Sequence, residues 1–248
     1  MGGRVMTRML VTRPEPDAQS SLSRLQALDI EGVTAPLMER FTLDISLPPA
    51  DGFAAVVLTS ANAVRTLVDR GVVGDYAHLP VLAVGDRTAR DAEQAGFGRV
   101  SSAAGSFGDL VNAIGLSGLK GPLFYPTGKH QSADLAKAVA PMGVMVATAK
   151  IYDMVAIAAL PSAILDALGD GGISAVLVYS RRTAEIFAQL ASSLERTQRQ
   201  RLGMLCMSEA VAEPLLAAHF NRISLADRPD EEAMMALALG FARAQTGP

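Results

Sequence analysis

The chain has 248 residues, 50% of them hydrophobic, and a formal net charge of -3. Its length suffices for one large domain or two ordinary domains with a substantial core. The slightly acidic balance argues against a broad nucleic-acid-binding surface, although a local group of Arg and Lys side chains can still meet an acidic small molecule.

Cysteine usage and hydropathy set the expected compartment. Cys206 is the single cysteine, and one thiol can form neither an internal disulfide nor a metal site by itself, which favours a reducing compartment. Uninterrupted apolar stretches such as residues 154–160 are far shorter than the ~20 residues that cross a bilayer. We therefore expect a cytoplasmic protein without a membrane partner.

The amino-terminal part predicts a strand, a helix and two extended segments. Residues 9–12 form the first predicted strand, and the segment Arg13-Pro14-Glu15-Pro16 leaves it, because two prolines disfavour both a strand ladder and a helix. Arg13 thus lies at the carboxyl end of a strand. A helix follows from Asp17 and ends by Gly32, where an extended segment begins. Residues 37–41 also look extended but lack the apolar character of a core strand, which suits an exposed connection.

The clearest strand-to-helix corner follows residues 54–58. This apolar, β-branched run is typical of a strand that is buried on both faces. Ser60 and Asn62 come next as capping residues, and apolar side chains at helical spacing continue to Gly71. In open parallel sheets ligands bind at such corners, and the exposed N–H groups of a helix start suit anions.

Strands and helices alternate through the rest of the chain. Four later segments are predicted strands that are followed by small or polar residues. Residues 81–84 are followed by Gly85, and residues 123–125 by a polar and basic loop over 126–132. Residues 175–179 end before Ser180, and residues 204–207 end before Ser208. Residues 144–153 are also expected to be extended. This pattern indicates parallel α/β layers.

An internal repeat supports two similar units. Residues 59–62 have a counterpart in 179–182, residues 84–87 in 207–210, and residues 106–110 in 230–234. The predicted fold class is therefore α/β, with two similar doubly wound parallel sheets of the flavodoxin-like type.

Several segments together resemble the uroporphyrinogen-III synthase family. They are Thr59-Ser60-Ala61-Asn62-Ala63-Val64, Val84-Gly85-Asp86-Arg87-Thr88-Ala89 and Ser106-Phe107-Gly108-Asp109-Leu110, supported by Val11-Thr12-Arg13-Pro14, Lys150-Ile151-Tyr152 and Tyr179-Ser180. They follow one another in the family's order from about residue 9 to about residue 239. The resemblance implies one domain from residues 1–37 and 154–248, a second from 41–149, and a two-stranded connector from 38–40 and 150–153.

The resemblance also implies a reaction. Family members convert linear hydroxymethylbilane to uroporphyrinogen III in tetrapyrrole biosynthesis, without a metal or organic cofactor. The terminal hydroxyl leaves as water, ring D attacks the resulting azafulvenium cation through its substituted carbon, and the spiro intermediate fragments and recloses with ring D inverted. Without an enzyme the chain closes uninverted, so the catalyst must mainly control the shape of the substrate. We expect a monomer that acts on this anionic linear tetrapyrrole and not on nucleic acid.

Candidate site residues follow from the resemblance and from the strand exits. Water loss needs a proton donor, and the resemblance places Tyr152 beside the substrate cleft, where its phenol can donate; a tyrosine that only packs on the connector is the alternative. The substrate carboxylates require basic or N–H-rich partners. The predicted substrate-binding residues are Arg13, Ser60, Asn62, Gly85, Thr88, Gly128, Lys129, Ser180, Arg181 and Ser208, with helix capping or a solvated surface charge as the alternative for each polar one.

Other classes of site and function have less support. His78 and His219 have no carboxylate or cysteine at ligand spacing, so no metal site is predicted, and His130 is interpreted as a neutral loop residue. Gly85 and Gly128 form neither a dinucleotide nor a P-loop fingerprint, which disfavours a phosphate-using enzyme. The main alternative is a non-catalytic bilobal module that binds an anionic small molecule.

Overall fold

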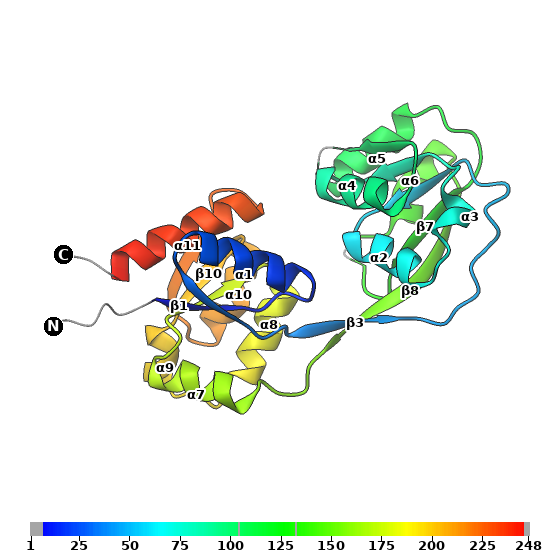
Figure 1. The fold of residues 1–248 in the computed structure, drawn as a ribbon. Helices are drawn as coiled ribbons and strands as arrows, with labels where there is room; N and C mark the ends of the chain where they lie inside the picture. Colours follow the sequence, from blue (N-terminus) through cyan, green and yellow to red (C-terminus); the bar gives the residue numbers. More distant parts are fainter. Residues whose placement is uncertain (1–6, 104, 132, 246–248) are drawn as a thin grey trace. The chain divides into compact units, whose positions relative to one another are not determined.

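A computed structural model describes residues 7–103, 105–131 and 133–245. The chain forms two compact units: unit 1 contains the residues up to 39 and those from 155 onward, and unit 2 contains residues 40–154. Figure 1 shows unit 1 in blue and in yellow to red, and unit 2 mainly in cyan and green. These ranges lie within a few residues of the predicted domain ends, and the two-stranded connector stays a prediction.

Unit 1 is a five-stranded parallel sheet in the order β2-β1-β9-β10-β11. Its strands are β1 (Arg8–Val11), β2 (Glu31–Thr34), β9 (Ala175–Val178), β10 (Gly203–Cys206) and β11 (Arg222–Leu225). Its helices are α1 (Asp17–Ala27), α7 (Ser162–Asp170), α8 (Arg181–Leu190), α9 (Arg196–Arg201), α10 (Glu209–Ala217) and α11 (Glu231–Gln245). This strand order is that of the flavodoxin-like folds, as the sequence predicts.

The sheet of unit 1 is buried on both faces. Alternate residues of β9 point to opposite sides: Val176 joins a core with α8 and α10, whereas Leu177 joins a second core with α1 and α11. Figure 1 shows α1 and α11 on one side of the sheet and α7 to α9 on the other. Two covered faces explain why the strands of this unit are apolar without alternation.

Unit 2 is a six-stranded sheet in the order β3-β8-β7-β4-β5-β6. Its strands are β3 (Met38–Thr42), β4 (Ala55–Leu58), β5 (Val81–Ala83), β6 (Val100–Ser102), β7 (Leu123–Gly128) and β8 (Val146–Ala156). Its helices are α2 (Ala61–Asp69), α3 (Val73–Tyr76), α4 (Asp86–Ala95), α5 (Phe107–Leu116) and α6 (Leu135–Val139), with a 3₁₀ turn, η1 (Ala140–Met142), after α6. All the pairings among β4 to β8 are parallel.

The sheet of unit 2 is also covered on both faces. Val56 and Phe124 pack with α2, α3 and α4 on one face, and Val57 and Leu123 pack with α5 and α6 on the other. The strand ends that start α2, α4 and α5 therefore share one edge of the sheet, which is the edge where doubly wound folds bind ligands.

The two sheets are circular permutations of one another. Strands β6-β5-β4-β7-β8 of unit 2 correspond in order and direction to β11-β10-β9-β1-β2 of unit 1. The strand registers agree, since Ala55 of β4 faces Leu123 of β7, and Ala175 of β9 faces Met9 of β1. The internal repeat in the sequence is thus the same structural unit entered at two different strands.

Two predicted segments differ from the observed strands at their ends or in their pairing. The predicted loop over 126–132 is wrong at its start, because β7 continues to Gly128 and pairs with β8 throughout. Pro126 is tolerated because the pairing with β4 has ended at Phe124, so the proline lies beyond the part of the ladder that is paired on both sides. The extended residues 37–41 form β3, which lies next to β8; the Leu43 N–H donates to the Ile151 carbonyl.

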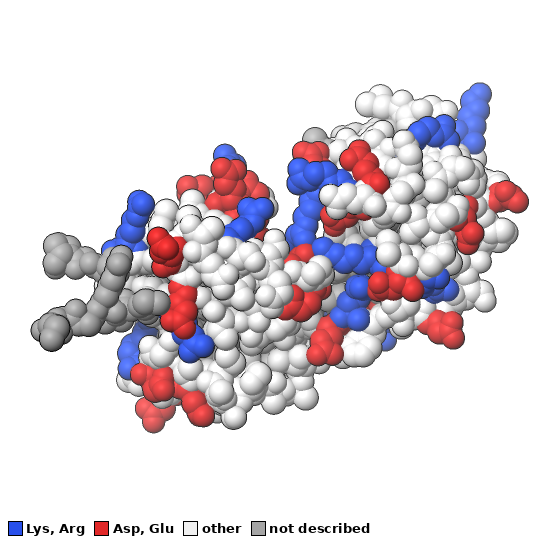
Figure 2. Space-filling view, in the orientation of Figure 1, with Lys and Arg blue, Asp and Glu red and all other residues white. Residues whose placement is uncertain are grey.

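Charged side chains of both signs are spread over the visible surface of each unit. Figure 2 shows Lys and Arg interspersed with Asp and Glu over the visible face of each unit, without a large field of one sign. No helix within the described residues is long and apolar enough to cross a bilayer.

A close contact at the start of β10 makes unit 1 sensitive to one methyl group. A Cβ on Gly203 would lie 2.2 Å from a ring carbon of the buried Phe241, whereas a Cβ on Gly240 would meet nothing within 4 Å. We expect Gly203→Ala to lower the free energy of unfolding by about 1–3 kcal/mol, as overpacking does. The control Gly240→Ala, in the same helix as Phe241, should raise it by about 0.5–1 kcal/mol, because alanine favours helix. Urea melts followed by circular dichroism measure both, and equal stability of the two variants would contradict the packing.

Candidate functional site

The strand ends of unit 2 surround a small cavity of about 160 Å³. It lies where β4 and β7 end and where β8 passes them. Its lining residues are Thr59, Ser60, Phe107, Tyr125, Thr127, His130, Gln131, Ala133 and Tyr152. A site that encloses a whole drug-sized ligand measures roughly 300–1,000 Å³, so this strand-end pocket can enclose only one part of a larger ligand.

Tyr152 reaches the strand-end pocket because β8 is irregular beside it. Thr127 of β7 faces Lys150, but the next residue, Gly128, faces Tyr152, so β8 carries Ile151 as an extra residue. Ile151 and Tyr152 consequently pack in the same core, although regular pleating would place them on opposite faces. A β-bulge of this kind re-aims a side chain next to a functional site.

Gly128 provides the space that the Tyr152 ring occupies. A Cβ at position 128 would lie 2.8 Å from Cε2, 2.9 Å from Cζ and 3.1 Å from the hydroxyl oxygen of Tyr152. These are closer than real Cβ contacts, and the backbone of Gly128 does not have the left-handed conformation that would itself favour glycine. The steric demand of the tyrosine is therefore the reason for glycine at this position.

The environment of Tyr152 keeps its phenol protonated. Its side chain is 7% exposed, and burial raises the pKa of Tyr152 above its usual value, partly offset by a hydrogen bond with the Ser60 hydroxyl. Ser60 also caps α2, because its hydroxyl accepts from the Asn62 N–H at 3.2 Å. Capping and contact with the pocket are thus combined in one serine, and proton donation by Tyr152 stays a prediction.

Further polar groups of the pocket come from neighbouring strand ends. The Thr59 hydroxyl lies 3.0 Å from the Tyr125 hydroxyl, and Thr127 is buried at the end of β7. Phe107 opens α5, whose start is fixed by a capping box between Ser106 and Asp109. The pocket is therefore lined by several hydroxyls and by the aromatic rings of Phe107, Tyr125 and Tyr152.

Two basic side chains lie beside the Asp153 carboxylate, and one of them, His130, also lines the pocket. Lys129 Nζ is 3.2 Å from Asp153 Oδ2, and His130 Nε2 is 3.6 Å from Asp153 Oδ1. Both basic side chains are more than half exposed, whereas the Asp153 side chain is 14% exposed. The structure thus places the predicted Lys129 beside Tyr152, together with an Asp153 that the sequence pattern does not single out.

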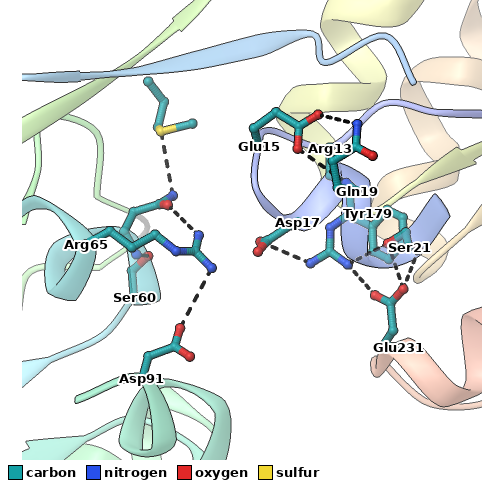
Figure 3. Close-up of polar contacts among 12 residues, drawn as sticks. Arg13, Glu15, Asp17, Gln19, Ser21, Ser60, Arg65, Asp91, Tyr179 and Glu231 are labelled. Carbon is teal, nitrogen blue, oxygen red and sulfur yellow. Dashed lines mark hydrogen bonds and ion pairs between the residues drawn. The ribbon is translucent and has the colours of Figure 1, made fainter. Parts of the chain in front are cut away.

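The other predicted residues of unit 2 lie on the helices that start at strand ends. The Asn62 side chain accepts from Arg65 at 3.1 Å and donates to the Met154 sulfur at 3.6 Å, contacts that Figure 3 shows next to Ser60. Gly85 caps α4 and approaches another glycine, since its Cβ would lie 3.3 Å from the Gly105 Cα. Thr88 is only 6% exposed within α4. Substrate contact by Asn62, Gly85 and Thr88 stays a prediction.

In unit 1 the predicted Arg13 is held in a polar cluster. Its guanidinium pairs with Asp17 at 3.3 Å and with Glu231, and it stacks on the Tyr179 ring at 4.2 Å. The hydroxyls of Ser21 and Tyr179 both donate to Glu231, at 2.7 and 3.2 Å. Figure 3 shows Arg13 between Asp17 and Glu231. Two carboxylates already neutralise this cation, and its contact with substrate stays a prediction.

This polar cluster occupies the place that corresponds to the pocket of unit 2. Under the permutation, Tyr179 takes the position of Thr59, Arg13 that of Thr127, and Glu231 that of Phe107. In unit 1 these three side chains contact one another, whereas in unit 2 their small or apolar counterparts line a cavity. The strand-end pocket is thus a feature of unit 2 that the shared fold does not impose.

The remaining predicted residues of unit 1 begin helices. Ser180 caps α8, since its hydroxyl accepts from the Thr183 N–H at 3.1 Å, and Ser208 precedes α10 without a side-chain cap bond. Arg181 is exposed and pairs with Glu185 and Glu213 on the surface. A surface pair of this kind contributes little to stability, and its part in binding stays a prediction.

The residues that sequence reasoning missed share one signal. Thr59 and Thr127 directly precede the predicted Ser60 and Gly128, and Phe107 opens the helix of a motif that was already singled out. Counting every residue at a strand exit would have found them. Asp153 and the pairing of Tyr125 with Thr59 depend on the bulge and the strand order, which the sequence does not display.

Within the described parts of the chain, no three His, Cys, Asp or Glu side chains come together as a metal site requires. Three such ligands are the usual minimum for a catalytic zinc. The polar groups of the pocket are mainly hydroxyls, which suit hydrogen bonding to an organic ligand.

Comparison with known proteins identifies relatives of this fold. A family model described as "Uroporphyrinogen-III synthase HemD" matches residues 20–236. The crystal structure of uroporphyrinogen-III synthetase from Helicobacter pylori is 18% identical with a TM-score of 0.66, over 95% of this chain and 100% of that one. A mutant uroporphyrinogen III synthase from Thermus thermophilus is 17% identical with a TM-score of 0.55, over 97% and 100%. No curated protein matches the sequence.

The buried phenols predict how stability changes at high pH. Burial raises the pKa of Tyr179, and the neighbouring Glu231 carboxylate raises it further. A tyrosine whose pKa is raised in the folded protein stabilises the fold fully at pH values below its pKa in the unfolded chain, about 10. This stabilisation is lost as the pH rises above that value. Between about pH 10 and about pH 12 the free energy of unfolding should fall, and it should fall less steeply for Tyr179→Phe. Urea melts across this range measure both slopes, and parallel curves would contradict the burial of a neutral phenol.

Proposed function

The chain belongs to the uroporphyrinogen-III synthase family, and we infer that it cyclises hydroxymethylbilane in tetrapyrrole biosynthesis. The match of the family model over residues 20–236 carries this conclusion, because it covers all of unit 2 and every strand of unit 1 except β1. The doubly wound fold agrees with it, as the matches to the two synthase structures show.

The site that we propose for the chemistry is the strand-end pocket of unit 2. Its volume of about 160 Å³ is suited to one end of a four-ring chain, so the remaining rings must lie outside it. Holding one end fixed limits the conformations from which the chain can close. Such positioning favours attack by the substituted carbon of ring D over the uninverted closure.

Tyr152 is the proposed proton donor in this pocket. A phenol is protonated at neutral pH, and burial raises the pKa of Tyr152 further, so the side chain holds a proton that it can give to the departing hydroxyl of hydroxymethylbilane. Water forms, and the electron pair of the breaking C–O bond leaves with the oxygen. The Ser60 hydroxyl, which hydrogen-bonds to the phenol, stabilises the phenolate that remains.

Recognition of the substrate carboxylates is assigned to the surroundings of the pocket. Lys129 is exposed directly after the end of β7, and the first N–H groups of α2 and α4 begin at Ser60 and Gly85 on the same edge of the sheet. Helix starts of this kind favour anions. We further propose that the protein acts as a monomer in the cytoplasm, without a metal or organic cofactor.

The proposed function predicts both the product and the effect of one hydroxyl. Purified protein given fresh hydroxymethylbilane should yield mainly the type III isomer after oxidation and separation of the porphyrins. Tyr152→Phe should lower kcat by about 100-fold, because general acid catalysis contributes about that much, while type III still predominates.

A matched tyrosine controls for the loss of a buried phenol. Tyr76 is also buried in unit 2, where its hydroxyl donates to the Pro48 carbonyl away from the pocket, so Tyr76→Phe should keep the wild-type rate. A wild-type protein that yields only the type I isomer would overturn the enzyme assignment and favour the binding module. Equal rates for wild type and Tyr152→Phe would overturn only the role of Tyr152.

A further inference from the structure

We propose that His130, oriented by Asp153, is the proton acceptor of the reaction, distinct from the donor Tyr152. The proposal rests on the proposed function, since it assigns a second proton transfer in the same pocket. The imidazole of His130 and the phenol of Tyr152 both line the strand-end pocket of unit 2. His130 comes from the segment that follows β7, and Tyr152 comes from β8.

Asp153 has a free acceptor directed at the imidazole. Its Oδ1 atom is buried, and no hydrogen-bond donor of the described residues lies within bonding distance of it. His130 Nε2 is 3.6 Å away, just beyond that distance, and Lys129 holds the other oxygen at 3.2 Å. A buried carboxylate oxygen without a donor is costly, so a small rotation of the exposed imidazole that brings Nε2–H onto Oδ1 is favourable.

The backbone fixes this pair relative to Tyr152. The Lys129 N–H donates to the Tyr152 carbonyl at 2.8 Å, which ties the segment before His130 to β8 at the bulge. Asp153 is the next residue of the same strand. With Nε2 directed at Asp153, the other nitrogen, Nδ1, is left as the site for a proton. Among the described residues, the charged and titratable groups that pair with His130, share Asp153 with it or line its pocket are Asp153, Lys129, Tyr125 and Tyr152.

The stoichiometry of the reaction requires an acceptor. The substrate differs from the product by one water, so the proton given to the departing hydroxyl must be matched by a proton lost elsewhere. When ring D recloses through its unsubstituted α-carbon, that carbon still carries hydrogen. The C–H bond breaks, its electron pair restores the aromatic pyrrole, and the proton passes to Nδ1 of His130. Imidazole is the side chain whose ordinary pKa lies nearest neutral pH, and the Asp153 carboxylate, 3.6 Å from Nε2, is the group that orients it.

Kinetic isotope effects test this assignment with His130→Gln. We expect kcat to fall by about 100-fold with little change in KM, as loss of a general base predicts. Deuterium on the unsubstituted α-carbon of ring D should slow the variant much more than wild type, because proton removal then limits the rate. Asp153→Asn should show the same isotope signature with a smaller loss. His78→Gln, an exposed histidine of unit 2 outside the strand-end pocket, should match wild type.

A second variant separates proton transfer from folding. Imidazole added to His130→Ala should restore part of the lost rate, which a purely structural defect would not allow. If His130→Gln keeps the wild-type rate, or loses rate without an enhanced isotope effect and without rescue of His130→Ala, the proposal is wrong. These outcomes all require a wild-type protein that forms type III, whereas wild-type formation of type I alone would refute the proposed function itself.

Discussion

The contact between the Tyr152 ring and the backbone of Gly128 is the constraint on which the site depends. The ring fills the space that a Cβ at position 128 would need. It lies there because one extra residue in β8 directs the Tyr152 side chain into the same core as Ile151. The same irregularity places Asp153 next in the strand and lets the Lys129 N–H bind the Tyr152 carbonyl. Tyr152, Asp153 and the start of the loop at Lys129 are therefore positioned by a single local distortion.

The two permuted sheets have the same fold but differ in whether side chains fill the edge at their strand ends. In unit 1 the strand ends carry Arg13, Tyr179 and Glu231, which satisfy one another in a partly buried cluster. In unit 2 the corresponding positions carry Thr127, Thr59 and Phe107, which leave a cavity. The fold supplies a common edge of strand ends and helix starts, and three side chains decide whether that edge is filled or open. The side chains at the strand ends, and not the fold, therefore determine what each edge can bind.

Much of the architecture could be predicted from local patterns, and the details of the site could not. The alternation of apolar strands with capped helices, and the repeat of residues 59–62 at 179–182, indicate two doubly wound sheets, because period and capping are local properties of the sequence. Ser60 and Ser180 are confirmed as helix caps. The pairing of Arg13 with Glu231 joins residues far apart in the chain, and the position of Asp153 depends on a bulge that no hydrophobic period displays. The sequence pattern places the end of β7 too early, because proline and glycine usually end a strand, whereas β7 continues through Pro126 to Gly128.

The most direct test of this account is the isomer-resolved kinetics of Gly128→Ala together with its crystal structure. A methyl group at this position must displace the Tyr152 ring, since it would lie 2.8 Å from a ring carbon. The account predicts a displaced ring and a rate of type III formation as low as that of Tyr152→Phe. Gly98→Ala, where a Cβ would meet nothing within 4 Å, should keep the wild-type rate. A Gly128→Ala protein with a displaced ring and an unchanged rate would contradict the claim that this contact positions the catalytic phenol.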